Sequence, residues 1–199
     1  MSAFELVFAL FGLLLGLAIA EVLGGFSRAV KLRRSQRRQV RIGWLTPLLG
    51  LFVILDLTSF WVLAFGARDQ LQANYLTLVA VLAIVGVYYI AASLIFPDDP
   101  EEWPDFDEHY DRQNRLVIVG LLTANMASAI SLTVLEEFVP TPPASMPSDA
   151  DVIVDGVAGL AILVLLIVLI YVKGRRTNAA ILAVLSALLV ASAVADAAV

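Results

Sequence analysis

Six long apolar runs constrain this chain more than any other feature of its sequence. They lie at residues 3–26, 44–65, 75–96, 116–138, 152–172 and 178–198. A helix needs about 20 residues to cross a hydrocarbon core of about 30 Å, and each run is close to that length or longer. The runs therefore predict six transmembrane helices and an all-α fold.

The connections between these runs are too short for a further folded domain, so residues 1–199 are predicted to form a single membrane domain. The chain is 60% hydrophobic and 16% charged, against about 45–50% and about 25% in soluble domains. It has no cysteine and one histidine. These facts exclude soluble classes, disulfide frameworks, thiolate metal sites and paired haem histidines.

The distribution of Lys and Arg predicts the orientation of the helices. The connections at residues 27–43, 97–115 and 173–177 contain twelve of the thirteen basic residues. The positive-inside rule places basic connections in the cytoplasm. Both termini are therefore predicted to be extracytoplasmic.

Two of the predicted cytoplasmic connections carry opposite charge. The simplest interpretation of the basic one is orientation and contact with anionic lipid headgroups, at about 1 kcal/mol per Lys or Arg. The alternative is a docking surface, either between the two connections or toward a basic partner. The residues considered for it are Arg33, Arg34, Arg37, Arg38, Asp98, Glu101, Asp105 and Asp107.

The acidic connection has further features of its own. Asp105 or Asp107 is a candidate cap for a short helix through Tyr110 that leads into the fourth run. Clustered carboxylates also suit divalent cations, but the spacing lacks the glycine of an EF-hand loop. No metal site is predicted here.

Asp56 lies near the centre of the second run, where a carboxyl group is costly. Insertion of an Asp at the middle of a membrane helix costs about 2.5 to 3.5 kcal/mol. Asp56 is therefore expected to face the bundle interior, where it must find hydrogen-bond donors or stay protonated. Asn125 is the predicted partner, and Ser59 and Tyr88 are candidates to join it.

Glu21 lies nearer the cytoplasmic end of the first run, where its side chain is expected to extend toward Arg28. One interpretation of the intramembrane polar residues is a lock that holds helices together. Another is a proton or cation path through Asp56, Asn125 and Glu21, because intramembrane ionisable groups often mark such paths. A ligand pocket is a third.

Small residues recur every four positions on two of the runs. Such spacing lets helix backbones come close, as in G-x-x-x-G pairs. The simplest interpretation is packing inside the bundle, and the alternative is a surface for self-association or for a partner, with the last run the better candidate. The residues are Gly12, Gly16, Ala20 and Gly24 on the first run, and Ala183, Ala187, Ala191 and Ala195 on the last.

Several of these features together resemble an uncharacterised family of small polytopic bacterial inner-membrane proteins. They are the glycine-rich first run, the Arg-rich connection and the sequence Leu-Ile-Phe-Pro-Asp from Leu94 to Asp98, followed by Asp107, Tyr110 and Arg115. The resemblance covers roughly residues 1–135. It implies a bacterial plasma membrane and no particular mechanism.

The sequence therefore favours a non-enzymatic membrane protein that acts by packing, as an accessory or scaffolding subunit or as a homo-oligomer. Its expected partners are membrane lipids and another membrane protein or itself, with no nucleic acid and no cofactor. The first alternative is a small proton- or cation-conducting channel or carrier that uses Asp56 and Glu21. The second is a membrane enzyme that uses acidic-connection carboxylates with a divalent metal on a lipid headgroup.

Overall fold

The computed structural model describes residues 3–34, 41–71, 74–99, 103, 105–139 and 149–197. Within these ranges the fold is helical, with one isolated bridge between Arg41 and Asp105 and no strand. This confirms the all-α prediction. The elements are α1 (Ala3–Arg34), α2 (Leu45–Gly66), the 3-10 helix η1 (Ala67–Asp69), α3 (Tyr75–Ser93), α4 (Phe106–Phe138), α5 (Asp149–Tyr171) and α6 (Arg175–Ala197).

Five helices in the described part of the chain, α1, α2, α3, α4 and α6, are long and apolar enough to cross a membrane. The protein is therefore a helical membrane protein. The remaining helix, α5, is also apolar, but its stretch Gly156–Tyr171 is shorter than the other five.

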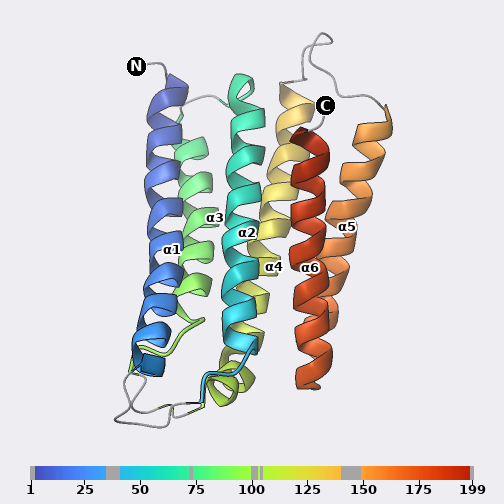
Figure 1. The fold of residues 1–199 in the computed structure, drawn as a ribbon. Coiled ribbons are helices and arrows are strands. Elements are labelled where there is room, and N and C mark those ends of the chain that lie inside the picture. Colours follow the sequence, from blue (N-terminus) through green and yellow to red (C-terminus); the bar gives the residue numbers. More distant parts are fainter. Residues whose placement is uncertain are drawn as a thin grey trace.

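The helices form two layers of three (Figure 1). One layer contains α1, α2 and α6, and the other contains α3, α4 and α5. The middle helices α2 and α4 also contact each other across the layers. Side chains at that contact therefore lie at the centre of the bundle.

Below, the end at which α1 begins and α6 ends is called the upper end, as it is drawn in Figure 1.

Two helices extend beyond their apolar runs. α1 continues to Arg34, with Lys31 and Arg33 also in its last turn, where positive charge interacts favourably with the helix dipole. α4 begins at Phe106, ten residues before the predicted start, because the Asp105 side chain caps it. A large part of each connection predicted at residues 27–43 and 97–115 is therefore helical.

Two glycines that the period-four pattern does not contain allow helices to come close. A Cβ atom at Gly25 of α1 would collide with the Phe96 ring, and one at Gly120 of α4 would lie 3.0 Å from the Ala91 Cβ of α3. The absence of a side chain at these two positions therefore lets α1 and α4 pack closely against the lower half of α3 and the residues that follow it.

Candidate functional site

A hydrogen-bonded group of three polar side chains lies at the centre of the bundle. The Tyr88 hydroxyl donates to Oδ2 of Asp56 over 3.1 Å, and the Asn125 amide donates to the same oxygen over 3.0 Å. The Asn125 amide also lies 3.1 Å from the Tyr88 hydroxyl oxygen. We call these three residues the midplane cluster. It joins α2, α3 and α4.

The position of the midplane cluster follows from the fold. Asp56 is about 16 Å from the start of α2 and about 15 Å from its end, at 1.5 Å per residue. Asp56 and Tyr88 are buried, with exposed fractions of 2% and 1%. A carboxyl group at this depth is stable only with nearby donors. The two helices that face α2 provide them.

The other two polar residues expected near Asp56 have different partners. The Ser59 hydroxyl donates to the backbone carbonyl of Asp56 rather than to its carboxyl group, over 2.8 Å. Glu21 accepts from the Arg28 guanidinium over 3.3 Å, which is the contact expected from the sequence. No hydrogen bond or ion pair among the described residues joins Glu21 to Asp56. Ser59 and Glu21 are therefore not members of the midplane cluster.

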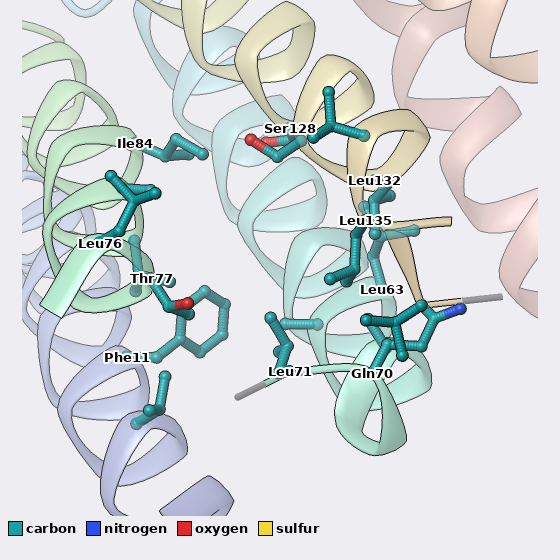
Figure 2. Close-up of a pocket in the computed structure, with 18 of the residues that line it drawn as sticks. Phe11, Leu63, Gln70, Leu71, Leu76, Thr77, Ile84, Ser128, Leu132 and Leu135 are labelled. Atoms are coloured by element: carbon teal, nitrogen blue, oxygen red, sulfur yellow. The ribbon is translucent and has the colours of Figure 1, made fainter. Parts of the chain in front are cut away.

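An apolar crevice of about 590 Å³ lies above the midplane cluster, between α1, α2, α3 and α4. All but five of its lining residues are apolar. In Figure 2, Ile84 and Ser128 lie at its inner end, and Gln70 and Leu71 lie at the opposite end. No sequence pattern indicates this crevice, because its walls come from four separated segments of the chain.

The floor of the crevice is one helical turn above the midplane cluster. Ile84 precedes Tyr88 by four residues, and Ser128 follows Asn125 by three, so the separation is about 5 to 6 Å. Phe60 also lines the crevice, and its ring packs against that of Tyr88 with centroids 5.3 Å apart. The ring of Phe60 therefore lies between the crevice and the polar group below it.

At the lower end, the two oppositely charged connections are joined by a contact that we call the lower latch. The Thr46 hydroxyl donates to the carbonyl of Phe106 over 2.9 Å, and the Phe106 amide donates to the carbonyl of Arg41 over 3.1 Å. The Leu45 amide donates to Oδ1 of Asp107 over 3.4 Å, so Asp107 caps the start of α2. Backbone groups, the Thr46 hydroxyl and the Asp107 carboxylate make this latch, and no Arg side chain of the described residues takes part in it.

Among the remaining charged residues of interest, the structure describes Asp105, Arg33, Arg34 and Asp98. Asp105 accepts from the Asp107 amide over 2.9 Å and thereby caps α4. Arg33, Arg34 and Asp98 are exposed. Arg37, Arg38 and Glu101 lie outside the described residues.

Further contacts at this end were not expected from the sequence. The Arg175 guanidinium pairs with the Asp111 carboxylate at 2.6 Å and joins α6 to α4. The Arg112 guanidinium lies 4.9 Å from the centre of the Trp103 ring, whose edge contacts His109. These pairings join residues far apart in the chain or depend on a loop conformation. The positions of the charges in the sequence therefore did not predict them.

The α6 stripe and the middle of the α1 stripe do not pack inside the bundle as expected. Ala183, Ala187 and Ala191 of α6 are exposed, and so are Gly16 and Ala20 of α1. A Cβ at Gly16 would meet no atom within 4 Å. Among the other members, Gly12 lies against Trp61, Gly24 lies near the Arg28 side chain, and the side chain of Ala195 is outside the described part.

The physical reason is that larger side chains on other faces of α1 and α6 fill the core. Leu15 and Val22 of α1 are fully buried, as are Leu182 and Leu185 of α6. Burial of large apolar side chains gives dense packing inside the bundle. Ala183, Ala187 and Ala191 of α6, and Gly16 and Ala20 of α1, are left on the surface of the protein.

Comparison with protein-family models, with curated proteins and with solved structures found no match. Among the described residues, no group of three His, Asp or Glu side chains is placed to hold a metal ion.

Proposed function

We propose that the protein is a non-enzymatic integral membrane protein that acts by helix packing, as an accessory or scaffolding subunit or as a homo-oligomer. The observation that carries this proposal is the exposed alanine stripe of α6, formed by Ala183, Ala187 and Ala191. In a bilayer, helices associate through close van der Waals contact, which small side chains allow. α6 already packs against α2 and α5 through its other faces.

The midplane cluster has a structural role in this proposal. Its hydrogen bonds connect three helices of both layers at the depth where an unpaired polar group is most costly. It therefore acts as a lock that fixes how α2, α3 and α4 pack. A bundle held in one arrangement presents the α6 stripe to a partner as a rigid surface.

The proposal includes six spans with both termini outside the cytoplasm of a bacterial cell. It is supported by the even number of α-helices in the described part of the chain, by the start of α1 and the end of α6 at one end (Figure 1), and by basic residues at the other. Arg33, Arg34 and Arg175 lie at that lower end, which the positive-inside rule places in the cytoplasm.

A matched pair of substitutions tests the packing function. Ala187→Leu adds bulk to the stripe, and Ala193→Leu adds the same bulk at another exposed position of α6. Protein solubilised from native membranes in mild detergent would be sized by native mass spectrometry. We expect an assembly larger than one chain, reduced at least tenfold by Ala187→Leu and not by Ala193→Leu. A monomer without co-purifying proteins would contradict the proposal.

The second candidate function is a small proton- or cation-conducting channel or carrier. The observation that favours it is the Asp56 carboxyl group at the centre of the bundle, one turn below the crevice. Proton and cation flux into liposomes would be measured with the unchanged chain and with Asp56→Asn. Absence of flux, or flux unaffected by Asp56→Asn or by Glu21→Gln, would exclude this function.

A further inference from the structure

The crevice has the depth of one leaflet of a bilayer. Its lining extends from Leu76 to Ile84 on α3 and from Ser128 to Phe138 on α4. These stretches are about 12 and 15 Å long at 1.5 Å per residue. The hydrocarbon core of a bilayer is about 30 Å thick, so the crevice spans about half of it.

The edges of the crevice are continuous with the surface that faces lipid. Leu76 of α3 is 77% exposed and Phe138 of α4 is 79% exposed, and Val134 is also exposed. All three line the crevice. Their exposed parts contact lipid chains in a membrane, so the same hydrocarbon phase adjoins the edges of the crevice.

Two hydroxyl groups that line the crevice already donate to the protein. The Ser128 hydroxyl donates to the carbonyl of Ala124 over 2.7 Å, and the Thr77 hydroxyl donates to the Asn74 side chain over 3.1 Å. An apolar ligand leaves both of these bonds intact. A polar ligand would have to compete with them in a largely apolar space.

The volume of the crevice is that of a small-ligand site. The crevice offers about 590 Å³, which lies within the usual range of about 300 to 1,000 Å³ for small-ligand sites. A flexible hydrocarbon chain fits a space of this size and lining.

From these observations we propose that the crevice binds an acyl chain of a membrane phospholipid from the leaflet at the upper end. The end of the chain lies against Phe60, Ile84 and Ser128, one turn above the midplane cluster. The bound chain keeps water away from Asp56. This inference concerns a site different from the α6 stripe and does not depend on association with another protein.

Photolabelling in vesicles tests this proposal. The unchanged protein would be reconstituted with phosphatidylcholine that carries a diazirine either at the end of an acyl chain or near its carboxyl end. Labelled residues would then be located by mass spectrometry. We expect the terminal diazirine to label Ile84 and Ser128, and the other probe to label Leu76 and Leu135 near the mouth. Labelling of outward-facing residues alone by both probes would overturn the proposal.

Two alanines of α3 provide a matched comparison. Ala80 lines the crevice, whereas Ala83 does not, and both are exposed. Ala80→Trp is expected to reduce labelling of Ile84 and Ser128 at least fivefold, and Ala83→Trp is expected to leave it unchanged. Ala64→Phe, on the α2 wall, should have the same effect as Ala80→Trp. The proposal would also be refuted if labelling of Ile84 and Ser128 were unchanged in both crevice variants. Cross-linking of Ile84 and Ser128 to a second protein would refute it as well.

Discussion

Replacement of Tyr88 by phenylalanine removes one hydroxyl group from the midplane cluster and leaves the ring in place. The ring contact with Phe60 can therefore persist, and only hydrogen bonding changes. The lost hydroxyl donates to Asp56 and lies within hydrogen-bond distance of the Asn125 amide. The substitution therefore tests whether these bonds hold α3 to α2 and α4.

The structure gives the size of the expected effect. Hydrogen bonds between membrane helices contribute about 0.6 kcal/mol on average and at most about 1.7 kcal/mol. Loss of two such bonds costs about 1.2 kcal/mol, and a buried group left without its donor adds a penalty of about 1 to 3 kcal/mol when nothing replaces it. We therefore expect Tyr88→Phe to lower the free energy of unfolding by about 1 to 4 kcal/mol, the upper part of the range applying if nothing replaces the lost donor.

Tyr89→Phe provides the control, because it makes the same chemical change on the next residue of α3. Tyr89 is 41% exposed, so this change should stay within about 0.5 kcal/mol of the unchanged protein. Unfolding would be followed by circular dichroism as SDS is added to protein in mild detergent. Equal stability of the two variants would refute the role assigned to the Tyr88 hydroxyl.

A double-mutant cycle with Asn125→Ala extends this test. Tyr88 and Asn125 donate to the same Asp56 oxygen, so their removal should not be additive. Contacting residues of one network usually show interaction energies of about 0.5 to 3 kcal/mol. Additivity within about 0.3 kcal/mol would mean that the cluster does not act as one unit.

Two further predictions concern packing and the lower latch. Gly25→Ala places a methyl group against Phe96, so we expect a loss of about 1 to 3 kcal/mol in the same unfolding assay, whereas Gly16→Ala, which enters open space, should cause no loss. Equal effects of the two changes would contradict the packing described for Gly25. Thr46→Val removes the hydroxyl that donates to Phe106 and should cost about 1 to 3 kcal/mol, because it leaves that buried carbonyl with one donor fewer. An unchanged unfolding midpoint for this variant would show that the latch does not contribute to stability.

Much of the architecture could be predicted from hydropathy. Continuous apolar runs of about 20 residues indicated the helices because a bilayer leaves few alternatives for such a segment. The burial of Asp56 and its pairing with Asn125 were also expected, since both lie deep within apolar runs and need polar partners. The fine boundaries were less predictable. The extension of α4 to Phe106 depends on a cap at Asp105 rather than on hydropathy.

The placement of the small-residue stripes shows where a local pattern stops being informative. A period of four marks one face of a helix but does not say whether that face points inward. In this bundle Leu182 and Leu185 of α6 fill the core, so the alanine stripe of α6 lies outside. The glycines that do allow close approach, such as Gly25, have partners that only the fold defines.

The sequence alone determined that the chain is a helical membrane protein and that Asp56 needs polar partners inside the bundle, because the cost of polar groups in hydrocarbon depends mainly on their depth along one helix. Only the tertiary structure decided that Tyr88 and Asn125 share one Asp56 oxygen, that the connections meet at Thr46 and Phe106, and that an apolar crevice lies one turn above the cluster. These features depend on which helices are neighbours and how each is rotated about its axis. Both are set by the packing of side chains from several helices at once.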